Sequence, residues 1–131
     1  MLSGSHVLIA DDDPDVLAAV AESLEQLDAN VVRANSGTEL IDRLADSGPF
    51  DLVVTDVAMP WMTGVSAMRA ARTAGLRMPT IVMTALSDET IPAAVKRLGQ
   101  DVTLLRKPFE IHELESMAEK LLANRRPDVA D

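Results

Sequence analysis

The alternation of two hydrophobic patterns along this chain is the feature that most constrains its fold. Short apolar runs typical of β-strands recur five times, and segments with apolar residues at helical intervals follow them. The runs span residues 7–10, 30–34, 52–54, 80–84 and 102–105. Because a strand–helix–strand crossover joins parallel neighbours, five such units predict one parallel sheet with helices on both faces and no second domain.

Capping signals place the starts of the expected helices. Asp13 precedes Pro14, which suits the first position of a helix, so we expect Asp13 to cap the helix after the first run. Ser36 and Glu39 form a capping box for the second helix. A fourth helix is expected over residues 90–98, and the helical pattern of the last helix decays after residue 122.

Length and composition narrow the class of protein. Residues 1–124 are the predicted domain, and residues 125–131 are a polar tail that is either a free terminus or the start of a linker. The net charge of −9 disfavours direct binding of nucleic acid. The apolar runs fall far short of the ~20 residues that span a bilayer, and the chain has no visible secretion signal and no Cys. We therefore expect a cytoplasmic protein without membrane contacts, disulfides or thiolate metal sites.

Four of the five predicted strands end in residues with charged or reactive side chains. Ligands of an open parallel sheet bind beyond the carboxyl ends of its strands. These strand ends carry Asp11, Asp12, Asp13, Asp56, Thr84 and Lys107. Taken singly, each is commonly a helix cap, a turn residue, a β-former or an exposed charge. Their joint occurrence at one rim of the sheet indicates a binding site.

The carboxylates at this rim predict a metal and a phosphoryl chemistry. Clustered carboxylates repel one another unless a cation neutralises them. An open, all-oxygen set with few protein ligands suits Mg²⁺ more than Ca²⁺. A carboxylate beside such a metal can attack phosphorus, and the phosphoryl oxygens are then stabilised by an ammonium and a hydroxyl donor. The strand ends offer all of these groups.

Four strings of residues carry a resemblance to a known family. They are Val-Leu-Ile-Ala-Asp-Asp-Asp-Pro, Asp-Leu-Val-Val-Thr-Asp-Val-Ala-Met-Pro, Val-Met-Thr-Ala and Arg-Lys-Pro-Phe. In this order and spacing, from His6 to about Ala123, the chain resembles the receiver domain of bacterial two-component response regulators. The resemblance implies a doubly wound, flavodoxin-like α/β fold whose five-stranded parallel sheet has the order 2-1-3-4-5, with five helices.

The resemblance also gives three of the acids at the rim a role. Asp56 becomes the phosphoacceptor and a metal ligand. By the same resemblance, Asp12 would bind Mg²⁺ directly and Asp11 would bind it through water. The backbone carbonyl of Ala58 is a further metal ligand.

Two more roles fall on the fourth and fifth strands. Thr84 would hydrogen-bond a phosphoryl oxygen, and Lys107 would pair with the acceptor carboxylate before transfer and with the phosphoryl group after it. The bond between Lys107 and Pro108 is expected to be cis. Leu104 stands where the family usually has Tyr or Phe, whose ring moves together with the threonine. An aromatic switch therefore cannot operate here in its usual form.

Three loop residues bear on partners and on the lifetime of the phosphorylated form. Trp61 replaces a residue that is usually small, and it is either a partner contact or a cover over local apolar surface. The resemblance implies that the positions of Ala58 and Leu86 flank the approach of the hydrolytic water, and neither side chain hydrogen-bonds water. We expect a comparatively long-lived phosphorylated form, the alternative being that both residues are neutral.

The expected function is a phosphorylation-controlled signalling switch. It accepts a phosphoryl group from a sensor histidine kinase or a phosphotransfer protein, and it acts on a downstream protein or on an effector domain absent from this sequence. Its only catalysis is its own phosphotransfer and dephosphorylation. A pseudo-receiver that binds proteins without phosphate is the alternative that Leu104 keeps open. A phosphatase with an Asp nucleophile is disfavoured because Ala58 offers no acid as proton donor.

Overall fold

The computed structural model describes residues 4–57, 64–73, 78–85 and 102–124. Within these ranges the strands are β1 (His6–Ala10), β2 (Asn30–Ala34), β3 (Leu52–Asp56), β4 (Thr80–Thr84) and β5 (Val102–Arg106). The helices there are α1 (Pro14–Gln26), α2 (Gly37–Asp46), α3 (Gly64–Thr73) and α5 (Ile111–Asn124). The helix predicted over residues 90–98 lies outside the described residues.

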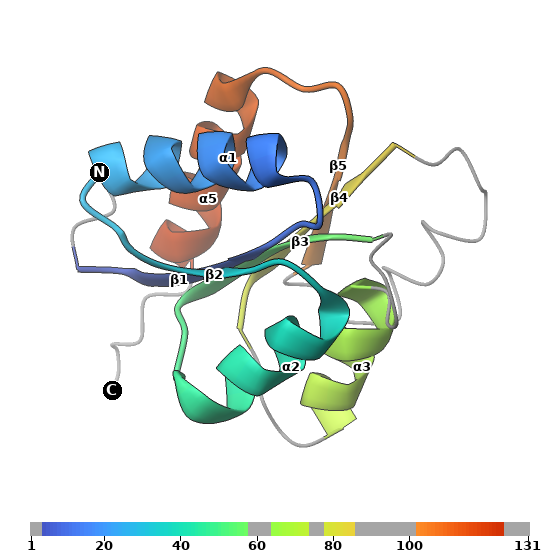
Figure 1. Ribbon diagram of the computed structural model, residues 1–131. Helices are drawn as coiled ribbons and strands as arrows, with labels where there is room; N and C mark the ends of the chain where they lie inside the picture. Colours follow the sequence, from blue (N-terminus) through green and yellow to red (C-terminus); the bar gives the residue numbers. More distant parts are fainter. Residues whose placement is uncertain (1–3, 58–63, 74–77, 86–101, 125–131) are drawn as a thin grey trace.

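The strands form one five-stranded sheet in the order β2-β1-β3-β4-β5, and every neighbouring pair is parallel. Helices α1 and α5 cover one face of this sheet, and α2 and α3 cover the other (Figure 1). The predicted fold class and strand order are thereby confirmed. Strand β3 extends two residues beyond its predicted run, so that Asp56 is the last residue of the strand.

Side-chain caps begin α1 and α2. The Asp13 carboxylate accepts hydrogen bonds from two backbone N–H groups in the first turn of α1, as its position before Pro14 predicts. The Ser36 hydroxyl accepts one from the backbone N–H of Glu39 at 3.1 Å. The Glu39 carboxylate, however, accepts from the backbone N–H of Asn35 at 2.8 Å, one residue before the cap. The capping box is therefore present in a form shifted by one residue.

The sheet separates two apolar cores. In β1, Leu8 and Ala10 belong to the cluster on the side of α2 and α3, whereas Val7 and Ile9 belong to the cluster on the side of α1 and α5. Strands β3 and β4 are buried along their whole length, because helices cover both faces of the sheet. The continuous apolar runs of the sequence correspond to these central strands.

A partly buried hydrogen bond joins α1 to α5. The hydroxyl of Ser23, which is 8% exposed, donates to the carboxylate of Glu115 at 2.5 Å. A hydrogen bond to a charged acceptor is stronger than one between neutral groups. Beside this polar contact, Leu24 of α1 and Leu114 of α5 are fully buried in one apolar cluster. The first and last helices of the described chain are therefore held to each other by both kinds of interaction.

The amino ends of β1 and β3 are closed by local contacts. The backbone N–H of His6 donates to the Asp51 carboxylate at 2.8 Å, and the backbone N–H of Asp51 donates to the His6 carbonyl at 2.7 Å. The ring of His6 lies 4.4 Å from the ring of Phe50, between centroids, and its Nδ1 lies 2.9 Å from the Pro49 carbonyl oxygen. The Gly48–Pro49 peptide bond is cis, which the sequence analysis did not predict.

The register of the sheet brings the carboxyl ends of the strands together. Ala10 of β1 lies opposite Thr55 of β3, so the next residue of each chain segment is an aspartate. In the same way Thr84, the last residue of β4, lies opposite Arg106, the last residue of β5. All four strands thus end at one rim, where the polar side chains of the sequence gather.

Candidate functional site

Three carboxylates meet at the carboxyl ends of β1 and β3. One oxygen from each of Asp11, Asp12 and Asp56 lies within 4.8 Å of the other two. Asp11 is fully buried and Asp56 is 6% exposed, whereas Asp12 is exposed. Buried carboxylates at this spacing repel one another strongly, and an all-oxygen donor set suits a hard divalent cation. The residues present therefore fit Mg²⁺, with Asp12 on the solvent side.

The Asp11 carboxylate is fixed from two directions. Its Oδ1 accepts a hydrogen bond from the backbone N–H of Asp13 at 2.9 Å. Its own backbone N–H donates to the carbonyl of Ala34 in β2 at 3.1 Å. The turn between β1 and α1 thus holds Asp11 inside the sheet, while Asp13 caps the helix. The consecutive acids Asp11 and Asp13 therefore have different roles. Asp13 is the helix cap, as its capping preference predicts.

Lys107 reaches two of the three carboxylates. Its Nζ lies 3.0 Å from Oδ2 of Asp11 and 3.5 Å from Oδ1 of Asp56, and 20% of its side chain is exposed. Burial by itself lowers the pKa of Lys107, but the hydrogen bonds and charges of Asp11 and Asp56 outweigh burial and raise this pKa above its ordinary value. The ammonium is therefore charged and held inside the acid cluster.

The position of Lys107 depends on β4. The backbone N–H of Lys107 donates to the carbonyl of Thr84 at 2.7 Å, and the Lys107–Pro108 peptide bond is cis, as the family resemblance implies. Thr84 is fully buried at the end of β4. Leu104 is half-buried and packs on the cluster beside α2 and α3. An aliphatic side chain thus takes the place of the ring at the predicted switch position.

The loop residues of the predicted site lie outside the described part of the chain. These are Ala58, Trp61 and Leu86. Among the described residues, the site therefore consists of Asp11, Asp12, Asp56, Thr84 and Lys107. The family resemblance pairs Lys107 with Asp56, but the shorter contact of its ammonium is with Asp11. The sequence carried no signal for this preference, because it depends on how a long side chain crosses between two strand ends.

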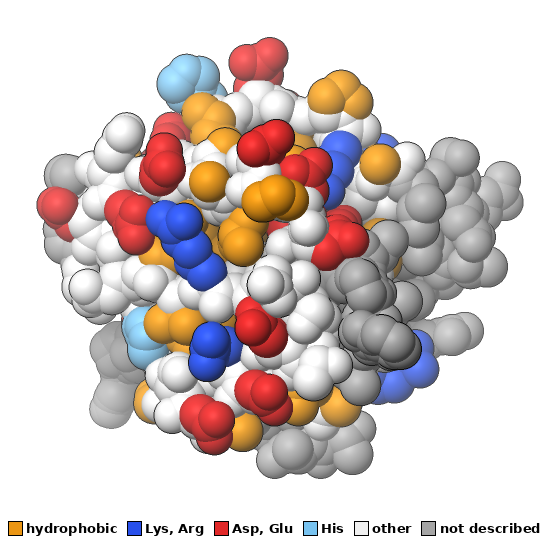
Figure 2. Space-filling model, in the orientation of Figure 1, with side chains coloured by type: hydrophobic (Ala, Val, Ile, Leu, Met, Phe, Trp, Pro, Cys, Tyr) orange, Lys and Arg blue, Asp and Glu red, His pale blue; other side chains and the backbone are white. Residues whose placement is uncertain are grey.

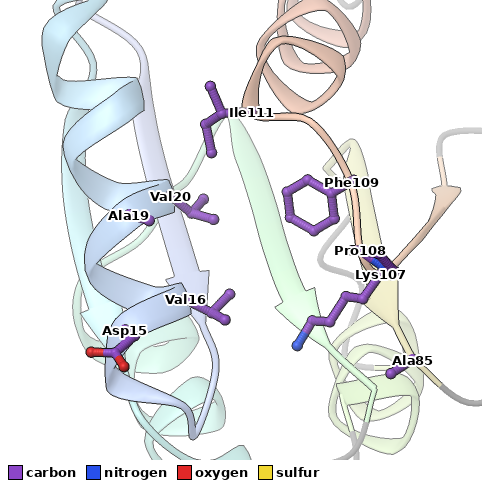
Figure 3. A pocket seen from close by; sticks show the side chains of 9 residues that line it. All are labelled: Asp15, Val16, Ala19, Val20, Ala85, Lys107, Pro108, Phe109 and Ile111. Atoms are coloured by element: carbon purple, nitrogen blue, oxygen red, sulfur yellow. The ribbon is translucent and has the colours of Figure 1, made fainter.

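An apolar groove lies next to the acid cluster, between α1 and the segment joining β5 to α5. Its volume is about 520 Å³. Figure 3 shows Val16 and Val20 of α1 facing Phe109 and Ile111, while the Lys107 side chain runs from the groove toward the end of β3. No sequence pattern predicted this groove, because it is formed by residues about 90 positions apart in the chain.

Acidic side chains dominate the surface around these features. On the face seen in Figure 2, Asp and Glu side chains are spread widely, and the Lys and Arg side chains lie scattered among them. The described residues of this face form no continuous basic surface of the kind that a phosphate backbone requires. No helix in the described ranges is both long enough and apolar enough to cross a membrane.

The sequence and the fold place this chain in a known class. Residues 7–119 match the family model described as the response regulator receiver domain. The chain therefore belongs to the response regulator receiver domain family, and the identification made from its motifs is confirmed. It is 34% identical over 123 residues to the response regulator MprA of Mycobacterium sp. (strain KMS), an alignment that covers 94% of this chain and 53% of MprA. The chain thus spans about half the length of the curated relatives that it matches.

Solved receiver domains have the same fold. The receiver domain of the Francisella response regulator 1452 superposes with a TM-score of 0.85 at 26% identity, covering 94% of this chain and 100% of that domain. The BeF₃-activated DrrB receiver domain gives a TM-score of 0.79 at 28% identity, covering 92% of this chain and 98% of that domain. Receiver domains of response regulators are signalling switches.

Proposed function

We propose that this chain is a switch that accepts a phosphoryl group on Asp56 from a phosphohistidine, carried by a sensor histidine kinase or a phosphotransfer protein, and then changes its affinity for a partner. One observation carries this proposal: the Lys107 ammonium lies inside a cluster of three carboxylates at the ends of the central strands. The position of Asp56 at the end of β3, with 6% exposure, supports its role as the acceptor.

The proposed transfer is a displacement at phosphorus. A carboxylate oxygen of Asp56 forms the new P–O bond while the P–N bond to the donor imidazole breaks, and the imidazole leaves with the electron pair of that bond. Lys107 stabilises negative charge on the phosphoryl oxygens, and the Thr84 hydroxyl donates a hydrogen bond to one of them. Mg²⁺ would be held by Asp12 and Asp56 directly and by Asp11 through water, with the Ala58 carbonyl as a further ligand, and would supply positive charge to the transferring group.

The apolar groove next to Lys107 is the proposed docking place of the phosphoryl donor. A helix that carries the phosphohistidine can lay an apolar face between α1 and Phe109, which brings its phosphoryl group to the rim beside Asp56. Asp12, Asp13 and Asp15 are exposed at this end of α1. They favour a donor surface with Lys or Arg beside its apolar face, because opposite charges steer association.

The proposed switch works without an aromatic ring. Leu104 packs on the cluster beside α2 and α3, so a movement of Thr84 toward a phosphoryl oxygen changes the packing of an aliphatic side chain instead of turning a ring. Ala58 and Leu86, which cannot hold the hydrolytic water through their side chains, would prolong the phosphorylated state. The output is a downstream protein or an effector domain attached to this one in a longer protein.

Incubation with acetyl phosphate and Mg²⁺ tests the acceptor. Intact mass spectrometry of the wild type should reveal an adduct of about 80 Da, the mass of one phosphoryl group. The adduct should disappear in EDTA and in the Asp56→Asn variant. An Asp56→Asn variant phosphorylated as fully as the wild type would refute the assignment of Asp56.

A phosphorylation-independent binding module is the second candidate, and Leu104 is the observation that favours it. In that case the chain binds its partner equally well with and without the phosphoryl mimic BeF₃⁻. The two candidates are separated by calorimetric titration of this chain with a binding partner purified from the cell fraction that holds the kinase. The titration is done with and without BeF₃⁻. A change in affinity on adding BeF₃⁻ favours the switch.

A further inference from the structure

Thr55 carries a hydroxyl into an apolar core, directly before the proposed acceptor, and it is fully buried. Because side chains alternate along a strand, Thr55 shares a face of the sheet with Val53 and Val57, which belong to the cluster beside α2 and α3. A hydroxyl buried among apolar side chains costs free energy unless it has a hydrogen-bond partner. Its partner is the backbone carbonyl of Asp56, to which it donates at 3.0 Å.

This carbonyl lies where the hydrogen-bond ladder ends on one side of β3. The backbone N–H of Val57 donates to Met83 of β4 at 2.9 Å, so by alternation the backbone groups of Asp56 face β1. The pairing of β1 with β3 has its last pair at Ala10 and Thr55. The Thr55 hydroxyl therefore supplies a donor to the Asp56 carbonyl one residue beyond that last pair.

We propose that Thr55 is a positioning residue for phosphoryl transfer, because its hydroxyl and β4 together fix the peptide group that joins Asp56 to Val57. This inference rests on the proposed function, which makes Asp56 the acceptor. The carbonyl of this peptide group accepts from the Thr55 hydroxyl, and its N–H donates to the carbonyl of Met83. Both polar ends of the peptide group are therefore held.

The orientation of this peptide group affects two parts of the site. It fixes the backbone from which the Asp56 carboxylate extends toward Lys107, whose Nζ lies 3.5 Å from Oδ1 of Asp56. It also sets the direction in which the chain continues toward Ala58, whose carbonyl is a metal ligand under the proposed function. A displacement of about 1 Å at a reacting group can slow a reaction on the order of 100-fold. Thr55 thus acts on the reaction through the backbone, from the opposite face of the sheet.

Two substitutions at Thr55 separate positioning from packing. Thr55→Val keeps the shape of the side chain and removes the donor, so acetyl phosphate with Mg²⁺ should phosphorylate this variant about tenfold more slowly than the wild type. Thr55→Ser keeps the donor and removes a methyl group, so its rate should stay close to that of the wild type. A packing role predicts the reverse order, because valine fills the core and serine leaves a cavity. Intact mass spectrometry of the adduct over time measures the rates.

Thr80→Val is the matched control. Thr80 is also fully buried, and its hydroxyl donates to the backbone carbonyl of Met78 at 3.1 Å, at the amino end of β4. Removal of this hydroxyl should leave the phosphorylation rate of the folded protein unchanged, because it lies at the end of the sheet opposite the acids. The positioning role would be overturned by a Thr55→Val variant that is phosphorylated no more slowly than Thr80→Val. It would equally be overturned by a Thr55→Ser variant that is slower than Thr55→Val.

Hydrogen exchange of the metal-free protein gives a readout that does not depend on phosphorylation. In EDTA, the amide of Val57 should exchange faster in Thr55→Val than in the wild type, because its peptide group has lost one of two hydrogen bonds. The amide of Val53, which donates to the carbonyl of Pro79 at 3.0 Å, is the reference and should change less. Equal changes at both amides would overturn the positioning role alone. A wild type that gains no phosphoryl adduct would overturn the proposed function, and the positioning role with it.

Discussion

Strands β1 and β3 pair along residues 7–10 and 52–55, yet the acidic side chains at the two ends of this pair have different surroundings. At the amino ends, the Asp51 carboxylate receives the backbone N–H of His6, and the loop is covered by Phe50, which is 2% exposed. At the carboxyl ends, three acids lie within 4.8 Å of one another. One end is closed by hydrogen bonds and packing, and the other holds acids that attract cations. The amino ends of the two strands therefore stabilise the sheet, and the carboxyl ends carry its reactive side chains.

Substitution of the acceptor is expected to have the largest effect on chemistry and almost none on stability. Asp56→Asn should abolish phosphorylation by acetyl phosphate, because the amide is no nucleophile toward phosphorus. Its free energy of unfolding in EDTA should fall by no more than about 0.5 kcal/mol below that of the wild type, since Lys107 keeps Asp11 as a partner and the loss of one carboxylate relieves repulsion. Mass spectrometry and urea unfolding check the two parts. A strongly destabilised Asp56→Asn would show that this end also supports the fold.

The opposite end should give the opposite result. Phe50→Ala removes a buried ring from the cluster beside α2 and α3 and should lower the free energy of unfolding by about 3–5 kcal/mol. The fraction phosphorylated at a temperature where the variant remains folded should equal that of the wild type. Urea unfolding and the acetyl phosphate assay measure these quantities. Loss of phosphorylation in folded Phe50→Ala would mean that the two ends are coupled.

The exposed acid of the cluster should control metal affinity. Asp12→Ala should weaken Mg²⁺ binding about tenfold or more, because it removes one of three carboxylates from the donor set. Calorimetric titration provides the measurement. Asp15→Ala, an exposed acid in the first turn of α1, is the matched control and should change the affinity far less. Equal affinities in the two variants would remove Asp12 from the metal ligands.

The lifetime of the phosphorylated form should show the smallest effect. Ala58→Asn and Leu86→Glu each add a polar group that can hold the hydrolytic water, so each should speed the loss of phosphate several-fold, and the double variant should be faster still. The decay of the adduct after removal of acetyl phosphate provides the rates. Variants that lose phosphate no faster than the wild type would show that these side chains are neutral.

Much of the fold and the composition of the site could be predicted from the sequence, because both rest on local patterns. Apolar runs and capping residues locate strands and helix starts, and the last residues of parallel strands share one rim. The cap at Asp13 is an example that the structure confirms. The roles of Asp56, Thr84 and Lys107 in phosphoryl transfer remain predictions.

What could not be predicted depends on contacts between distant segments. Lys107 contacts Asp11 more closely because of the path that its flexible side chain takes. The two residues lie 96 positions apart in the chain. The groove between α1 and Phe109 needs the packing of the first helix against the last loop. No single stretch of sequence encodes either of them.

The alternation of β1 between two cores has a consequence for how such a chain can evolve. Val7 and Ile9 serve one core, and Leu8 and Ala10 serve the other. Insertion of a single residue into this strand would exchange the two sets and misplace the aspartates that follow it. Lineages can therefore lengthen or rewrite the loops and the outward surfaces of the helices, whereas the strand tolerates substitution but no change of length. New partner specificities would arise on those surfaces, and the spacing that delivers the acids to the rim would stay fixed.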